Sequence, residues 1–328
     1  MLYPLTFQPV FKERLWGGRN LERLYQKALP PVTPIGESWE IADRPEGSSV
    51  IVNGPLAGKD LRWLMENQPK DLLGAAAALN GRFPLLIKIL DAQDKLSLQV
   101  HPPATMAARL GGEAKTEMWY IAHAEPAAAL FVGLKTGVTR ARFEQALRSG
   151  AGEDCVQRLP VKAGDAMFLP SGRLHAIGAG NVIFEIQQNS DTTYRVFDWN
   201  RVGPDGQPRE LHLEKSLECI DFTDFEPSLN QSKYSRNETF KVRYIVDEPL
   251  FRVDACQVNR GKRFHMRSDS FQILGLLRGS LLVKSGEHEL RMKPGDFALL
   301  PASLERATLT SQTQVEFLHI QPGLPRPR

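Results

Sequence analysis

A short run of alternating residues offers side chains that could bind a metal ion. Residues 96–102 read Leu-Ser-Leu-Gln-Val-His-Pro, and in an extended strand alternate side chains share one face. Ser97, Gln99 and His101 would then point one way and the apolar residues the other. Pro102 cannot continue a β-ladder, so we expect the strand to end just past His101. This histidine would then lie at the mouth of a possible site. The pattern is equally typical of a half-buried strand with one face in water.

A lysine within an apolar run is a second candidate for chemistry. Residues 83–90 read Phe-Pro-Leu-Leu-Ile-Lys-Ile-Leu and are apolar enough to form a buried strand, apart from Lys88. Burying an unpaired ammonium group is costly, so this side chain must reach solvent or a partner. Two interpretations stay open: the lysine extends to the surface, or it faces an anionic ligand.

A third alternating segment spans residues 115–121, Lys-Thr-Glu-Met-Trp-Tyr-Ile. As a strand it would place Lys115, Glu117 and Trp119 on one face and the residues between them on the other. A carboxylate and an ammonium group would therefore point in the same direction, toward a site or toward solvent.

Residues 60–80 differ from the β-like segments around them. Asp60 can cap a short helix with apolar residues at helical spacing, and Pro69 interrupts that helix. The alanine-rich run 72–79 predicts a second helix, because alanine has the highest intrinsic helix propensity. We therefore expect a small helical insertion at about residues 58–80.

One sequence pattern occurs twice in the chain. Residues 161–176, VKAGDAMFLPSGRLHA, align with residues 292–307, MKPGDFALLPASLERA, at a constant offset of 131 (292 minus 161). A tight Gly-Asp turn, an apolar strand and a Pro-containing corner recur together, which predicts two related all-β units. His175 in the first copy aligns with Arg306 in the second. We infer that one unit has a metal-ligand position and the other has kept only the scaffold.

Several segments resemble, in order and spacing, those of the type I phosphomannose isomerases, especially the shorter bacterial form. The segments are SLQVHPP, AKTEMWYI, LPSGRLHAIGAG and EIQQNSDTTYRVFDWNR, and the resemblance covers most of residues 1–210 and the C-terminal unit more weakly. It implies a mainly β fold of two cupin-type jelly-roll units, as barrels or sandwiches. The N-terminal domain, residues 1–235 with the helical insertion, would bind the metal, and the C-terminal domain, residues 236–328, would lack the ligand set.

The resemblance also implies a zinc-dependent enzyme that interconverts mannose 6-phosphate and fructose 6-phosphate. In the family the ligand positions correspond to Gln99, His101, Glu117 and His175. Zinc accepts imidazole nitrogen and carboxylate oxygen, and an amide oxygen is an adequate neutral donor. With only Glu117 anionic, a divalent ion keeps about one positive charge, which suits the stabilisation of a developing enediolate. A mixed nitrogen and oxygen set would also accept iron, manganese, cobalt or nickel.

Aldose–ketose isomerisation moves a proton between C1 and C2 through a cis-enediol, and it also needs a grip on the phosphate. Arg195 corresponds to the family's active-site arginine and could hold the enediolate oxygens or the phosphate. The alternative for this arginine is an ion pair with a carboxylate such as Asp198. Lys115 and Lys88 match lysines near the substrate in the family, and Ser97 is a further candidate contact. Which of these residues holds the phosphate stays open.

The general base and two rival functions also stay open. His101 would be occupied by the metal, Lys115 would need a depressed pKa, and a water on the metal is a third possibility. One rival is an iron-dependent cupin oxygenase, which the neutral Gln99 and the nearby cations disfavour. The other is a sugar-phosphate-binding protein without turnover, and the sugar itself could be one other than mannose.

Composition bounds the remaining possibilities. The 328 residues are 42% hydrophobic and 24% charged, as in a soluble globular protein, with a formal charge of +3. We expect no nucleic-acid partner because the basic residues form no stripe, and no membrane span because no apolar run is long enough. The three cysteines form no CxxC pair, so a reducing cytoplasm is the expected location. No feature of the sequence specifies an oligomeric state.

Overall fold

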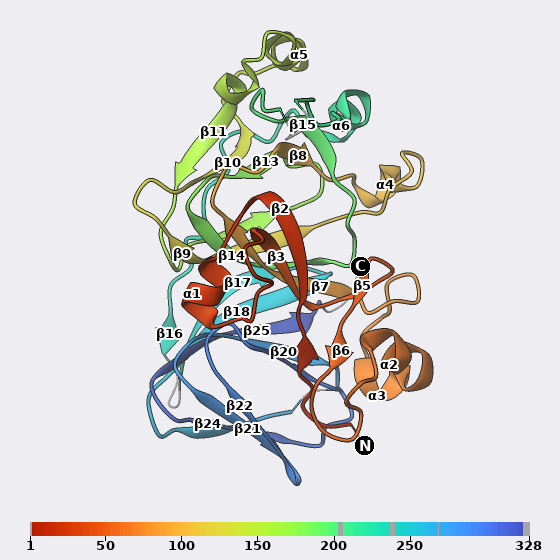
Figure 1. Ribbon diagram of the computed structural model, residues 1–328, viewed down its shortest axis with the longest axis vertical. Coiled ribbons are helices and arrows are strands. Elements are labelled where there is room, and N and C mark those ends of the chain that lie inside the picture. Colours follow the sequence, from red (N-terminus) through yellow and green to blue (C-terminus); the bar gives the residue numbers. More distant parts are fainter. Residues whose placement is uncertain (1, 203–205, 237–239, 268, 324–328) are drawn as a thin grey trace.

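The computed structural model describes residues 2–202, 206–236, 240–267 and 269–323, which form a stack of four main β-sheets (Figure 1). Strands between β2 and β15, apart from those of two short ribbons, build the first two of these sheets, and strands from β16 onward build the other two. The chain therefore folds as two β-sandwiches in sequence, and the prediction of a mainly β fold is confirmed. No helix in the described ranges is long and apolar enough to cross a membrane.

The first sandwich pairs a six-stranded with a five-stranded antiparallel sheet. Across the six-stranded sheet the order is β12 (Ala166–Leu169), β9 (Glu117–Ala124), β14 (Asn181–Gln188), β7 (Leu85–Ala92), β3 (Ile35–Ile41) and β2 (Val10–Gly18). Across the five-stranded sheet it is β11 (Val156–Pro160), β10 (Ala129–Leu134), β13 (His175–Ile177), β8 (Leu98–Val100) and β15 (Tyr194–Phe197). Apolar side chains from both sheets, Trp119 and Ile177 among them, fill the space between.

The second sandwich repeats this plan with fewer strands. Its six-stranded sheet has the order β16 (Ser235–Arg236), β17 (Phe240–Asp247), β18 (Phe251–Val258), β25 (Val315–Pro322), β20 (Gln272–Arg278) and β23 (Phe297–Leu300). Its four-stranded sheet has the order β19 (Arg263–Met266), β24 (Ala307–Ser311), β21 (Leu281–Ser285) and β22 (His288–Met292). The predicted boundary after residue 235 falls within β16, and the division into two domains stays a prediction.

Short helices and ribbons surround the four sheets. Helices α5 (Arg140–Arg148) and α6 (Leu213–Cys219) cover the outer face of the five-stranded sheet, through side chains such as Phe143 and Cys219. The other short elements are α1 (Asn20–Tyr25), α4 (Ala104–Ala107), the 3-10 helix η1 (Gly152–Cys155), and the ribbons β1 (Phe7–Gln8) with β6 (Val50–Ile51) and β4 (Asp43–Arg44) with β5 (Gly47–Ser48).

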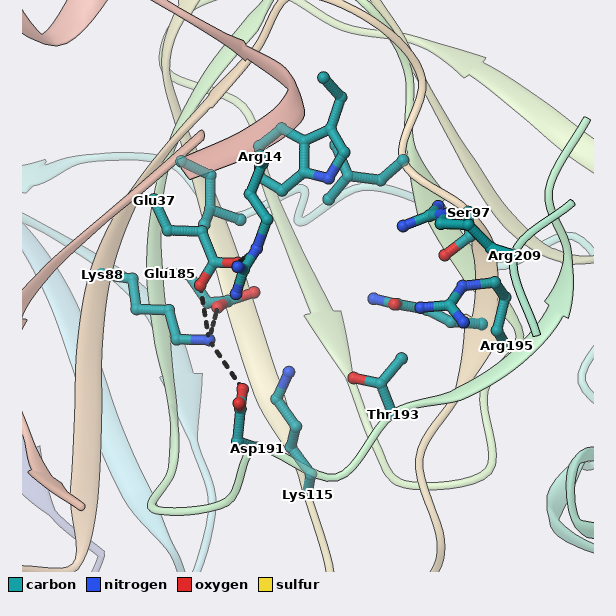
Figure 2. Close-up of a pocket in the computed structure, with 14 residues that line it drawn as sticks. Arg14, Glu37, Lys88, Ser97, Lys115, Glu185, Asp191, Thr193, Arg195 and Arg209 are labelled. Atoms are coloured by element: carbon teal, nitrogen blue, oxygen red, sulfur yellow. Dashed lines mark hydrogen bonds and ion pairs between the residues drawn. The ribbon is translucent and has the colours of Figure 1, made fainter. Parts of the chain in front are cut away.

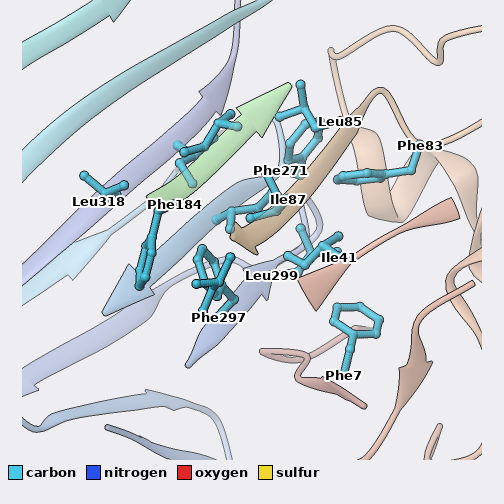
Figure 3. Packing of buried hydrophobic residues seen from close by; sticks show 14 of the residues in the cluster. Phe7, Ile41, Phe83, Leu85, Ile87, Phe184, Phe271, Phe297, Leu299 and Leu318 are labelled. Carbon is cyan, nitrogen blue, oxygen red and sulfur yellow. The ribbon is translucent and has the colours of Figure 1, made fainter. Parts of the chain in front are cut away.

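The two six-stranded sheets pack back to back and share one apolar core (Figure 3). Phe184 of β14 meets Phe297 of β23, with ring centroids 5.1 Å apart, and Phe83 meets Phe271 at 4.7 Å. The alternation along β7, β9 and β14 therefore sends every second side chain into this shared core and the others into the first sandwich. Side chains such as Lys88, one residue from the shared-core Ile87, thus face the interior of the first sandwich.

The helical insertion is shorter than the sequence predicts. Helix α2 (Leu61–Asn67) begins as expected, because the Asp60 side chain accepts a hydrogen bond from the backbone N–H of Trp63. Helix α3 spans Pro69–Leu73, so the prediction of a helix over residues 72–79 is wrong. The chain turns at Gly74, which has a φ of 61°, and the next N–H donates to the Asp269 carbonyl of the second sandwich. This tertiary contact overrides the helix propensity of the alanines.

The sequence repeat is a structural repeat. In each copy the glycine of the Gly-Asp turn has a positive φ and the aspartate accepts a hydrogen bond from a lysine backbone N–H three residues earlier. The two hydrogen bonds have nearly the same length: 2.9 Å from the backbone nitrogen of Lys162 to Asp165 Oδ2, and 2.8 Å from that of Lys293 to Asp296 Oδ2. The strands that follow, β12 and β23, then occupy equivalent places in their sheets, so the prediction of two related units is confirmed.

Replacement of Phe271 by alanine should destabilise both sandwiches, because it empties the core that they share. We expect the free energy of unfolding to fall by about 3–5 kcal/mol, as measured by urea denaturation. Tyr244→Ala, which removes a half-exposed ring from β17 of the second sandwich, is the control and should cost far less stability. A similar small loss for both variants would contradict the shared core.

Candidate metal centre and substrate pocket

Three buried side chains from both sheets of the first sandwich form a compact cluster. His101 directly follows β8, Glu117 begins β9 and His175 begins β13. One potential ligand atom from each lies within 4.8 Å of the others, and none of the three residues is more than 1% exposed. Nε2 of His175 is 3.3 Å from Glu117 Oε1, and Nε2 of His101 is 3.6 Å from Glu117 Oε2. Atoms bound at about 2.0–2.2 Å to a single ion lie roughly this far apart.

Backbone carbonyls orient both imidazole rings toward the cluster. Nδ1 of His101 lies 2.8 Å from the Thr192 carbonyl, and Nδ1 of His175 lies 2.8 Å from the Arg173 carbonyl. A proton on each Nδ1 leaves Nε2 with a free lone pair, which is the tautomer that a metal ligand needs. Burial, helped by the charge of Lys115, lowers the pKa of His101 to about 3, and burial also lowers the pKa of His175. Both rings are therefore neutral donors.

Glu117 supplies the negative charge of the cluster. Burial alone would raise the pKa of this carboxyl group, but Lys115 above all, with the two histidines, holds its pKa well below the usual range. Nζ of Lys115 lies 2.8 Å from Glu117 Oε2. Neither Glu117 Oε1 nor Nε2 of His101 has a hydrogen-bond partner among the described residues, although both atoms are buried. Buried orphans of this kind are what a bound cation would satisfy, so the residues fit a metal ion.

Gln99 lies against the same cluster. It pairs with His175 in the register of β8 and β13, and its amide nitrogen is 3.3 Å from His175 Nε2. The two ends of a glutamine amide have the same shape, so a half-turn of the amide would bring Oε1 to this place. Gln99 is thus positioned as the predicted fourth ligand, and that role stays a proposal.

The second sandwich has other side chains at the equivalent positions. Leu169 pairs with Glu117 across β12 and β9, and Leu300, at the repeat offset of 131, pairs with Gln272 across β23 and β20. Gln272 therefore stands where the first unit has Glu117, and Arg306 stands where it has His175. A neutral amide and a cation cannot replace the anionic and imidazole ligands, which explains why the cluster forms in the first unit.

A pocket of about 410 Å³ adjoins the cluster and contains every substrate-contact residue predicted from the sequence. Ser97, Lys88, Lys115 and Arg195 all line it, together with Gln99. Figure 2 shows that the lining side chains come from two sides, with Lys88 and several carboxylates on one and Ser97 and Arg195 on the other. The contacts of these residues with a substrate stay a proposal.

Lys88 is buried and paired with carboxylates. It is 4% exposed, and its Nζ lies 3.5 Å from Glu37, 3.4 Å from Glu185 and 3.8 Å from Asp191 (Figure 2). The interpretation in which this side chain extends to the surface is therefore wrong. Burial would lower the pKa of Lys88, but the carboxylates overcome this effect and raise it, so the ammonium group is charged.

Arg195 lies on β15 opposite Gln99 and is held by the backbone. Its Nη1 donates to the Glu210 carbonyl at 2.6 Å, and burial, followed by the charge of Arg209, lowers its pKa. Within the described residues no ion pair joins Arg195 to Asp198. Asp198 accepts instead from Arg201 and Arg209, so the alternative of an Arg195–Asp198 pair is not formed.

Sequence reasoning missed nine of the fourteen residues that line the pocket. The missed residues are Arg14, Trp16, Glu37, Leu90, Leu96, Glu185, Asp191, Thr193 and Arg209. Glu185 carried a signal, because it is the one charged residue within an apolar strand, the same criterion that selected Lys88. Its Oε1 accepts a hydrogen bond from Trp119 Nε1 at 2.9 Å, and burial, followed by the charge of Glu117, raises its pKa. Arg209 had no such signal in the sequence, because it lies on a loop and reaches the pocket by the path of that loop.

The fold and the site define a double-cupin protein with a candidate metal centre in its first unit. Residues 5–116 match the family model for the phosphomannose isomerase type I catalytic domain. The chain is also 36% identical over 320 residues to mannose-6-phosphate isomerase ManA of Bacillus subtilis, covering 97% of this chain and 99% of that protein. A mannose-6-phosphate isomerase of Streptococcus mutans is 33% identical over 306 residues. The chain therefore belongs to the type I phosphomannose isomerase family, as its sequence motifs predict.

Solved structures agree with this assignment. The crystal structure of mannose 6-phosphate isomerase from Bacillus subtilis superposes with a TM-score of 0.88 and 31% identity, covering 98% of this chain and all of that one. The apo form of the enzyme from Salmonella typhimurium has a TM-score of 0.75 at 18% identity, a likeness of fold alone. The matched range includes His101 and ends one residue before Glu117, so it covers one of the three cluster residues.

Loss of one cluster histidine should abolish metal binding. We expect the metal content to fall from about one tightly bound ion per chain in the unchanged protein to a small fraction of that in His175→Gln. The reason is that the variant loses a ligand from a buried site. Metal content after dialysis, measured by plasma mass spectrometry, checks this result. His265→Gln, on an exposed strand of the second sandwich, is the control and should keep its metal. Full metal content in His175→Gln would rule the cluster out as the binding site.

Proposed function

We propose that this protein is a metal-dependent aldose–ketose isomerase that interconverts mannose 6-phosphate and fructose 6-phosphate through a cis-enediol. The observation that carries the proposal is the buried cluster of His101, Glu117 and His175 beside a pocket that contains arginines and lysines. The named activity of the relatives, which match nearly the full chain, supports the same substrate pair.

We propose zinc as the metal ion, held by Gln99, His101, Glu117 and His175. When bound, the ion would stabilise negative charge on the substrate oxygens next to the transferred proton. Two neutral imidazoles, an amide and one carboxylate leave such an ion with a net positive charge, whereas a thiolate set would cancel it. The second sandwich would contribute stability but no ligand.

Glu185 is the candidate for the group that moves the proton. The two protein groups considered from the sequence are unsuited: His101 does not line the pocket, and Lys115 is paired with Glu117 at 2.8 Å. Glu185 lines the pocket, and Trp119 and Lys88 fix its two oxygens from different directions. A positioned carboxylate whose pKa is raised by burial suits proton abstraction from carbon near neutral pH.

Arg195 and Ser97 are the candidates for the phosphate end of the pocket, away from the carboxylates that surround Lys88 (Figure 2). Within the described residues Arg195 has no carboxylate within ion-pair distance, so its charge is available to an anion. Lys115 and Lys88 would serve the reacting end, where they hold the carboxylates and contact sugar hydroxyls. We also propose a cytoplasmic location, because all three cysteines are buried and unpaired.

Removal of the metal should abolish the isomerase activity. We expect purified protein to form fructose 6-phosphate from mannose 6-phosphate in a coupled assay, to lose at least about 100-fold in rate after complete chelation, and to recover with zinc. Activity that survives complete metal removal would refute the metal-dependent reaction. If the metal-loaded protein converts no hexose phosphate, a binding protein without turnover is the better reading.

Glu185→Gln should lower kcat by about 100- to 10,000-fold, the usual contribution of a general base, while the metal content stays that of the unchanged protein. The matched control is Glu37→Gln, which removes a different carboxylate from Lys88 in the same pocket. Steady-state kinetics with mannose 6-phosphate measure both. Equal losses of kcat in the two variants would show that Glu185 acts only as a partner of Lys88.

A further inference from the structure

The charges that line the pocket are divided unevenly between its two sides. On one side Lys88 and Arg14 are paired with the carboxylates of Glu37, Glu185 and Asp191. On the opposite side Figure 2 shows the guanidinium groups of Arg195 and Arg209 together. The three carboxylates outnumber their two cations, so an anionic group of a ligand would meet net negative charge on the first side and guanidinium groups on the second.

The arginine side carries an excess of positive charge. Arg195, Arg201 and Arg209 gather around one carboxylate, that of Asp198, which has Arg209 Nη2 at 2.6 Å and Arg201 Nη2 at 2.7 Å. Glu210, which binds Arg195 through its carbonyl, has no ion pair within the described part of the chain. Arg201 is also paired with Asp94 at 2.8 Å, so three guanidinium groups with two paired carboxylates leave one positive charge. A phosphate monoester near neutral pH carries about two negative charges and would be attracted to this side.

Asp198 fixes Arg209 before any ligand binds. Its two oxygens accept from Nε and Nη2 of Arg209 at 2.8 and 2.6 Å, a bidentate pair that holds the guanidinium plane. Asp198 is only 6% exposed, and although burial raises its pKa, the hydrogen bonds from Arg209 and Arg201 hold that pKa below the usual range. Nη1 of Arg209 has no hydrogen bond to any described residue. An arginine oriented in advance loses little entropy when it binds an anion.

We propose that Arg209 binds the 6-phosphate of the substrate together with Arg195, and that this pair selects a phosphorylated hexose over a neutral one. The inference rests on the proposed function, since it names the phosphate contact of that same pocket. Asp198 is then a positioning residue for Arg209. Arg201, the other partner of Asp198, lines a neighbouring cavity of about 390 Å³ and does not line the substrate pocket.

Arg201 provides a matched control for Arg209, because the two side chains share the Asp198 carboxylate. In Arg209→Gln we expect KM for mannose 6-phosphate to rise by about 10- to 100-fold, the loss of one charged hydrogen-bonding partner, with kcat little changed. Arg201→Gln should change KM by less than about five-fold. Arg209→Lys should recover part of the lost affinity, since a lysine restores the positive charge but not the paired N–H donors of a guanidinium group. Asp198→Asn should raise KM as Arg209→Gln does.

Binding of inorganic phosphate, measured by titration calorimetry on the metal-loaded protein, separates this inference from the proposed function. Arg209→Gln should weaken phosphate binding by a factor similar to its effect on KM, and Arg201→Gln should not. If the unchanged protein isomerises no hexose phosphate, the proposed function fails, and the phosphate titration still decides the role of Arg209. Equal phosphate affinity in Arg209→Gln and the unchanged protein, or a loss confined to kcat, would overturn the inference.

Discussion

The burial of one negative charge is the constraint on which the first sandwich depends. Glu117 lies between the two sheets with no exposed surface, where an isolated carboxylate would be strongly destabilised. Lys115 compensates part of that cost, but two neutral imidazoles turn their lone pairs toward the same carboxylate, and lone pairs repel it. A cation at the centre of the cluster relieves this arrangement. An ion that binds only the folded chain would also stabilise it, so metal binding at this cluster would be coupled to folding.

The second sandwich shows how the same scaffold is stable without that charge. Gln272 replaces Glu117, and the position of the buried Lys88 is taken, through the strand register, by Asp254 opposite His319. Burial raises the pKa of Asp254 to about 6 and lowers that of His319 to about 4. Near neutral pH His319 is therefore neutral, whereas Asp254 is largely ionised and pairs with the partly exposed Arg252 at 3.1 Å. The duplicated unit thus keeps polar residues inside but carries less buried charge. Its remaining role is the apolar face that it offers to the first unit.

The sequence predicts the elements of this molecule better than it predicts their assembly. The Gly-Asp turns and the strand alternation depend on local rules, so the repeat and the face shared by Lys115 and Glu117 could be read directly. The helix expected over residues 72–79 failed because Asp269, almost two hundred residues away, captures the backbone at Gly74. Local propensity cannot anticipate a contact of that range.

In the candidate site, too, some residues could be predicted from local patterns and others could not. Its three clustered side chains, which are candidate metal ligands, lie at strand ends within recognisable motifs, and the motifs predicted all three. The pocket lining is harder, because a residue such as Arg209 reaches the pocket by the path of a loop and by its pairing with Asp198. Neither the path nor the pairing leaves a pattern in the sequence. Arg195 itself was expected, but its freedom from carboxylates became apparent only when Asp198 was found to bind other arginines.

The uneven charge of the pocket fixes the direction in which a sugar phosphate can lie. Two unit charges 4 Å apart interact by about 4 kcal/mol at the effective dielectric of a protein surface. A dianion placed beside Glu37, Glu185 and Asp191 would meet the negative charge that Lys88 and Arg14 leave uncompensated, whereas beside Arg195 it would be attracted. In the proposed function the phosphate would therefore occupy the arginine side, and the opposite end of the hexose, with C1 and C2, would lie toward Glu185 and the cluster. Lys88 and Arg14 offset part of the charge of Glu37, Glu185 and Asp191, and the carboxylate that they leave uncompensated would disfavour a phosphate at this end.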